Sequence, residues 1–104
     1  MSKARIEPGV CGFSTTVNVI KVDKRRCTIQ IESECPHIQQ LAAALSEVDP
    51  FQEISFRGEG PRTLSLGAQY CQHPACPVPV GIIKAIEVEA GLALPRDVEI
   101  KLEK

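Results

Sequence analysis

The sequence predicts an α+β domain with two layers, in which two helices pack on one face of a mostly antiparallel sheet. Residues 13–22 and 27–33 each alternate apolar and polar side chains around a short polar turn, which is typical of a β-hairpin. Two later segments, residues 36–48 and 77–90, carry apolar side chains at helical spacing. Packing both helices on one face of a sheet buries all these apolar stripes in one core.

The hairpin comes first among the expected elements. Its first strand is rich in β-branched residues and directs one alternate set inward: Phe13, Thr15, Val17 and Val19. The second strand does the same with Cys27, Ile29 and Ile31. The polar residues 23–26 form the turn between them.

The first helix is expected to begin after Cys35, because Pro36 suits the first helical position and leaves Cys35 at the N-cap. It ends at Asp49, because a residue that precedes a proline is pushed out of the α region. Residues 51–57 are then expected to form a short strand, which the following Gly and Pro residues break.

The last third of the chain is expected to hold one more helix between two extended segments. Residues 63–70 alternate loosely and predict an edge strand or an extended loop, since Gly67 weakens a strand. The helix over residues 77–90 ends with Gly91 as its cap. Residues 97–104 alternate again and predict a closing strand. The expected order is ββαβ(β)αβ, in a single domain that covers residues 1–104.

Composition and charge exclude several classes of protein. The chain has 104 residues, 43% of them hydrophobic, with a net charge of -1 and scattered basic residues, so a nucleic-acid partner is not expected. No stretch approaches the roughly 18 apolar residues of a membrane span, and the first residues lack the apolar core of a signal peptide. A cytoplasmic location is expected. Five Cys, an odd number, argue against a disulfide framework in a reducing compartment.

Hairpin pairing brings two of these cysteines together. Paired residue numbers in a hairpin add to a constant, which a turn at residues 23–25 places at about 46 to 49. Cys11 and Cys35 satisfy this condition, so they are expected to lie nearly opposite each other at the open end of the hairpin. Cys27 lies on the inner face of the same hairpin, and we interpret it as a packing residue.

A second group lies just before the last helix. Cys71 and His73 are two residues apart, so they point the same way in an extended segment, and Cys76 follows where the helix begins. Helix N-termini present free N–H groups and a positive dipole, which stabilise a thiolate at Cys35 and Cys76.

Together these residues predict a metal site. Cys11, Cys35, Cys71 and Cys76 provide four thiolates, with His73 as a substitute ligand or as a residue that supports the ligands. Four N or S donors match a tetrahedral zinc site, and four thiolates also match an iron-sulfur cluster. The alternative interpretation is that free Cys residues behave as small buried hydrophobic residues.

Several stretches resemble those of a family of small uncharacterised proteins from anaerobic bacteria and archaea. They are Cys11-Gly-Phe-Ser-Thr, Ser33-Glu-Cys35, His73-Pro-Ala-Cys76-Pro-Val-Pro and Lys84-Ala-Ile-Glu-Val-Glu-Ala-Gly-Leu-Ala-Leu-Pro95. The resemblance covers nearly the whole chain and implies shared Cys positions and a low-oxygen setting. A narrower resemblance, Cys76-Pro-Val-Pro79, is to small sulfur-carrier proteins, whose Cys holds a persulfide at a helix N-terminus.

Three hypotheses of function follow from the sequence. The first is a metal-binding protein that holds zinc or an iron-sulfur cluster in the Cys cluster. The second is a thiol or sulfur-transfer protein in which Cys76 is the nucleophile. The third is a non-catalytic module that binds another protein and merely buries its Cys residues. A protein partner, or a redox or sulfur partner, is expected in each case, and no hydrolase or transferase motif is present.

Overall fold

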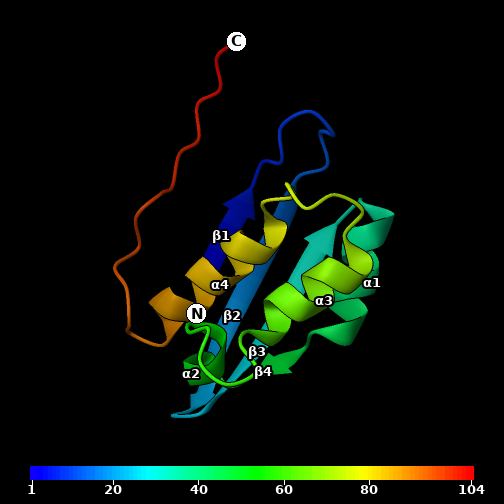
Figure 1. Cartoon of the computed structure of the whole chain (residues 1–104). Helices are drawn as coiled ribbons and strands as arrows, with labels where there is room; N and C mark the ends of the chain where they lie inside the picture. The colour runs from blue at the N-terminus through cyan, green and yellow to red at the C-terminus, as the bar shows by residue number, and fades with distance from the viewer.

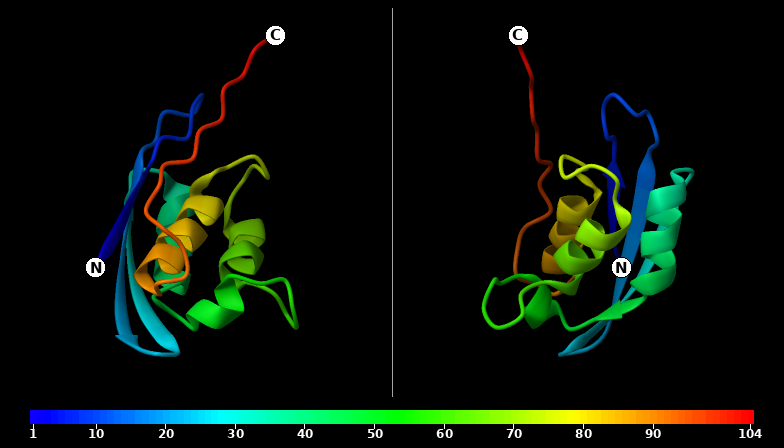
Figure 2. Two further views of the ribbon diagram at one scale, coloured as in Figure 1. Left: turned by 90° about the vertical axis from the view of Figure 1, so that its left-hand side faces the viewer. Right: turned by 45° about the vertical axis from the view of Figure 1, so that its right-hand side comes forward.

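The computed structural model describes residues 1–104, and its strands form one antiparallel sheet of four strands in the order β1-β2-β3-β4. The strands are β1 (Ser2–Ile6), β2 (Thr15–Asp23), β3 (Arg26–Ser33) and β4 (Glu47–Val48). The helices are α1 (Pro36–Ala44), α2 (Pro50–Glu53), α3 (Arg62–Tyr70) and α4 (Val78–Glu89). The helices lie on one face of the sheet (Figures 1 and 2). The α+β class with two layers is therefore confirmed, with four helices rather than two.

The predicted hairpin is confirmed as β2 and β3. Thr15 pairs with Ser33 and Lys21 pairs with Cys27, so the paired numbers add to 48, inside the range expected from the turn. Alternate residues of both strands point toward the helices. They join α1 and α4 in one core, whose fully buried members include Val17, Val19, Cys27, Leu41, Leu45, Ile82 and Ile86.

Strand β1 was not predicted from the sequence. It pairs with β2 from Ser2↔Val19 to Ile6↔Thr15, so the hairpin is the centre of the sheet and not its start. The alternation in β1 is short, with Ile6 buried and Lys3 and Arg5 exposed. Gly81 of α4 faces Ile6 so closely that a side chain there would collide with it. Helix α4 therefore packs directly on β1.

Helix α1 is shorter than predicted. It ends at Ala44, and the next residue, Leu45, has a non-helical backbone but is still fully buried. The chain then forms β4, in which Val48 pairs with Cys27. Hydrogen bonding to the free edge of β3 replaces the last helical turn that the apolar spacing had suggested.

The predicted strand over residues 51–57 is wrong, because a short helix starts there. Pro50 occupies the first helical turn, and the Asp49 side chain accepts a hydrogen bond of 2.9 Å from the Phe51 N–H. This cap and proline initiate α2 immediately after β4.

The predicted strand or loop over residues 63–70 is also wrong, because this segment is the helix α3. Its inward residues are three or four apart, namely Thr63, Leu66, Gly67 and Tyr70. The fully buried carboxylate of Glu53 in α2 accepts hydrogen bonds from the N–H groups of Arg62 and Thr63, at 2.9 and 2.8 Å, and from the Thr63 hydroxyl at 2.6 Å. A distant side chain thus satisfies the free N–H groups that begin α3.

The predicted helix over residues 77–90 is confirmed as α4, and Gly91, with a φ of 77°, follows its C-cap as expected. The predicted closing strand over residues 97–104 is absent. These residues are exposed and belong to no sheet, although their apolar side chains alternate. None of the helices is both long enough and apolar enough to span a membrane.

We expect Glu53→Gln to lower the free energy of unfolding by about 1–3 kcal/mol, because the amide turns an NH2 donor toward N–H donors and leaves a buried group unsatisfied. Urea unfolding followed by circular dichroism measures this loss. Glu59→Gln is the matched control, because Glu59 is exposed, and its effect should stay within about 0.5 kcal/mol. Equal small effects of both substitutions would show that the carboxylate does not hold α3 in place.

Candidate thiol site

Three of the five cysteines lie at one end of the helical layer, each at the terminus of a helix. Cys35 is the N-cap of α1, as predicted, with Pro36 in the first turn. Cys71 is the C-cap of α3, and Cys76 lies one residue before Pro77, the N-cap of α4. All three are half-buried and pack against the core cluster.

Two backbone turns set the positions of Cys71 and Cys76. The Cys71 N–H donates to the Gly67 carbonyl at 2.8 Å and closes the last turn of α3. The Cys76 N–H donates to the His73 carbonyl at 3.2 Å, so the loop between the helices is a tight turn rather than an extended segment. The short loop returns the chain beside the end of α3.

Close packing of α3 on α4 brings the two cysteines together. A Cβ at Gly67 would lie 2.8 Å from Cγ of Pro79, so only glycine permits this approach of the two helices. Gly67 and Pro79 are both buried. From the sequence, Gly67 is expected only to weaken a strand, because its spacing to the Cys-Pro-x-Pro segment does not reveal this contact between helices.

The Cys71 thiol lies in an environment that opposes its ionisation. Burial, the nearby Cys76 thiol, a hydrogen bond with that thiol and the more distant Cys35 together raise the pKa of Cys71 to about 11. Each of these contributions acts in the same direction, and no cation offsets them. The thiol of Cys71 is therefore near enough to interact electrostatically with both the Cys76 thiol and the Cys35 thiol.

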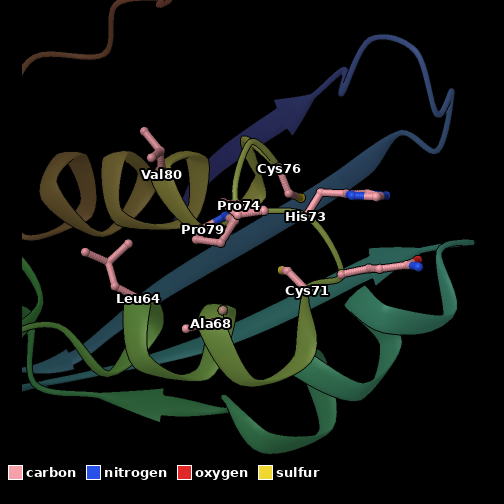
Figure 3. A pocket seen from close by; sticks show the side chains of 10 residues that line it. Leu64, Ala68, Cys71, His73, Pro74, Cys76, Pro79 and Val80 are labelled. Carbon is pink, nitrogen blue, oxygen red and sulfur yellow. The ribbon is translucent and has the colours of Figure 1, made fainter.

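Cys71 and Cys76 also line a small pocket between α3 and α4 (Figure 3). Its volume is about 400 Å³, and its apolar wall includes Leu64, Ala68 and Val80. Figure 3 shows that both Cys side chains extend into the space between the end of α3 and the loop before α4. A small ligand can therefore reach these thiols.

His73 and Cys11 are not part of this close group. The His73 side chain is exposed and points away from the two thiols (Figure 3). Cys11 is exposed in the loop that joins β1 and β2, so pairing of β2 with β3 ends before it reaches Cys11. This loop lies at the same end of the molecule as the loop before α4 (Figure 1). It turns on Gly9 and Gly12, which both have positive φ and a hydrogen bond of 3.0 Å between them.

Cys27 is fully buried on the inner face of β3, which confirms its predicted packing role. Burial is the main cause that raises the pKa of Cys27, and the charge of Glu89 adds to it. This thiol is therefore kept neutral inside the core.

The residues that could contribute to a metal site are the three gathered cysteines, with His73 and Cys11 in adjacent loops. As they stand in this structure, no three His, Cys, Asp or Glu side chains form a complete set of metal ligands. The established feature is thus a pair of interacting thiols with a third thiol nearby.

The comparisons with known proteins place the chain in a family without giving it an activity. The family model described as "Family of unknown function (DUF6951)" matches residues 2–102, so the chain belongs to this family. No curated protein and no solved structure matches the chain. The resemblance to an uncharacterised family is therefore confirmed, whereas the anaerobic setting and the likeness to sulfur carriers stay predictions.

We expect Cys71 to react slowly with iodoacetamide near pH 8, about two orders of magnitude more slowly than a free thiol with a pKa of about 8.5. Because the thiolate is the nucleophile, the rate should rise with pH until about pH 11, the pKa of Cys71. Peptide mass spectrometry after timed labelling measures this rate. Exposed Cys11 serves as the internal control for the reagent.

The substitution Cys76→Ala should shift this profile to lower pH, because it removes a neighbouring thiol and its hydrogen bond. Labelling of Cys71 at the rate of Cys11 at pH 8, or a profile that does not respond to Cys76→Ala, would contradict the proposed interaction of the two thiols.

Proposed function

We propose that this chain, a member of the family of unknown function DUF6951, binds zinc or an iron-sulfur cluster through Cys35, Cys71 and Cys76. The single observation that supports this proposal is that Cys71 and Cys76 line one pocket at the ends of two packed helices, with Cys35 near enough to add to the raised pKa of Cys71. Thiols placed near one another, with no cation beside them, are the ligand type that a thiophilic metal ion prefers.

A shared metal ion would require the two thiols to come close together. Zinc–sulfur bonds of about 2.3 Å in a tetrahedral site hold neighbouring sulfur atoms about 3.8 Å apart. Cys35, at the N-cap of α1, would supply the third thiolate. Metal binding would therefore draw together ligands from the ends of three helices.

The fourth ligand distinguishes the two kinds of metal centre. If His73 turns inward, three thiolates and one imidazole make a Cys3His zinc site. If the glycine-flanked loop folds over the site, Cys11 gives four thiolates, which suit zinc or an iron-sulfur cluster. A site closed by four protein ligands carries electrons or stabilises the fold and does not hydrolyse substrates, so a redox partner accompanies the cluster alternative.

One observation favours a second candidate function, which is sulfur transfer. Cys76 lines the pocket directly before α4, where a helix N-terminus is nearby and a small sulfur donor has access. In this alternative Cys76 carries the transferred sulfur atom and Cys71, with its raised pKa, stays a neutral neighbour. The third hypothesis, a protein-interaction module, requires only that the Cys residues are packing residues, and the half-buried position of Cys71 and Cys76 is compatible with it.

We expect the chain, purified without oxygen, chelator or histidine tag, to carry about one zinc ion, or iron with acid-labile sulfide. Cys35→Ser, Cys71→Ser and Cys76→Ser should each lose the metal and lower the melting temperature, because the free energy of metal binding also stabilises the fold. Elemental analysis, sulfide determination and a thermal melt measure these effects. Cys27→Ala is the control for metal content, which it should leave unchanged, because it removes a thiol outside the site.

Comparison of Cys11→Ser with His73→Ala identifies the fourth ligand, since only the variant that lacks it should lose the metal. A chain that is folded, metal-free and unable to take up zinc or iron would overturn the proposal. A mass increase of one sulfur atom on Cys76 would then support sulfur transfer. Unchanged stability and metal content in all the Ser variants would instead favour the interaction module.

A further inference from the structure

The last residues of the chain have the pattern of a strand but no strand to pair with. Val98, Ile100 and Leu102 alternate with charged residues and are 59%, 75% and 89% exposed. No backbone hydrogen bond involves residues 93–104, the last one along the chain being from Leu92 to Glu87. Figures 1 and 2 show this segment running along the β1 side of the molecule and then away from it. We call residues 97–103 the tail strand.

One edge of the sheet is correspondingly free. β1 is the outermost strand and pairs only with β2, so the N–H and C=O groups along its other side have no strand partner. An exposed edge of this kind is a template for another strand. Ser2 is fixed at the start of β1, because its hydroxyl donates to Glu89 of α4 at 2.8 Å. The outer edge of β1 is therefore held in place and is available to pair with another strand.

A groove beside this edge has room for a strand. It has a volume of about 890 Å³ and lies between β1 and the flank of α4 that carries Gly81, Ala85 and Val88. Residues 95–98 of the same chain border the groove, after which the tail strand leaves it. The apolar part of its lining includes Ala4, Ile6, Ala85 and Val88, and charged residues such as Lys3, Arg5 and Lys84 surround it.

We propose that the tail strand of one copy of this chain adds to the free edge of β1 in a second copy, and that the second copy returns the same contact. The alternation of side chains along the tail strand matches the alternation along β1, so Val98, Ile100 and Leu102 would face α4 on the side of Ala4 and Ile6. The net charges of the two outer faces are also opposite. On the opposite face of β1 the exposed Lys3 and Arg5 would lie beside Asp97, Glu99, Lys101 and Glu103 of the tail strand, which together carry a net negative charge. The present ion pairs Arg5–Glu7 and Glu99–Lys101, both on the surface, would have to rearrange.

The reciprocal exchange accounts for both unpaired features at once. Each copy has one free tail strand and one long free edge at β1, the opposite edge being the two-residue β4, so a twofold dimer would cover both the tail strand and the β1 edge. The length is sufficient, because seven extended residues span roughly 23 Å and the five residues of β1 about 17 Å. With a net charge of only -1 per chain, repulsion between two copies is weak.

The test is the mass of the full chain in solution, measured by light scattering after size-exclusion chromatography at micromolar to millimolar concentrations. We expect a dimer, with twice the mass of the 11.3 kDa chain. Leu102→Asp should give a monomer, because it places a charge in the apolar stripe. Leu94→Asp is the matched control, since Leu94 is 87% exposed but lies outside the tail strand, and this variant should remain dimeric.

Charge reversal tests the β1 edge itself. Lys3→Glu combined with Arg5→Glu should weaken the dimer about tenfold, and Asp97→Lys with Glu99→Lys in the same chain should restore it. Circular dichroism verifies that each variant is folded. A monomeric full chain overturns the proposal, whether or not hydrogen exchange shows the tail strand protected on its own β1. A dimer that survives Leu102→Asp, or a charge reversal without effect, also overturns it.

Discussion

The buried carboxylate of Glu53 is the interaction on which the position of the thiol site most depends. It is the one acidic side chain that is fully buried, and it accepts three hydrogen bonds from the first residues of α3. Removing a carboxylate from water is costly unless such donors replace the water. Because the donors belong to the N-terminus of α3, the carboxylate fixes where this helix begins and how it is directed. Cys71, at the other end of α3, is placed by the same interaction.

Two close contacts made by α4 extend this placement to the rest of the fold. Gly67 allows Pro79 to approach α3, and Gly81 allows Ile6 of β1 to approach α4. Side chains at either glycine would push α4 away from its neighbours. Helix α4 therefore packs closely against both α3 and β1, the outer strand of the sheet. Cys76 lies one residue before Pro77, the N-cap of this helix. The pair of thiols therefore results from packing across the whole helical layer and not from a local motif alone.

The sequence predicted the elements whose apolar spacing is long and regular. The hairpin, the starts of α1 and α4 and the burial of Cys27 follow from periodicity, prolines and turn residues. Helix α3 could not be predicted, because its cap is supplied by Glu53, nine residues earlier, and its inward positions include Gly67. Residues 97–104 show the converse error, since an alternating pattern specifies which side chains share a face but not whether a partner strand is present. The site was predictable in part: Cys35, Cys71 and Cys76 converge, whereas the position of Cys11 depended on a hairpin ladder that stops at Thr15.

The electrostatics of the gathered thiols favour a ligand role over a nucleophilic role for Cys71. Burial and neighbouring thiols keep its proton in place at neutral pH, so this residue is a poor nucleophile by itself. A bound cation reverses the balance, because the neighbouring thiolates then share a positive charge instead of repelling one another. The low reactivity expected of Cys71 and the proposed binding of a soft metal ion would thus be two consequences of one arrangement. Cys27 differs in this respect, because its thiol is fully buried in the core with no other thiol among the causes that raise its pKa.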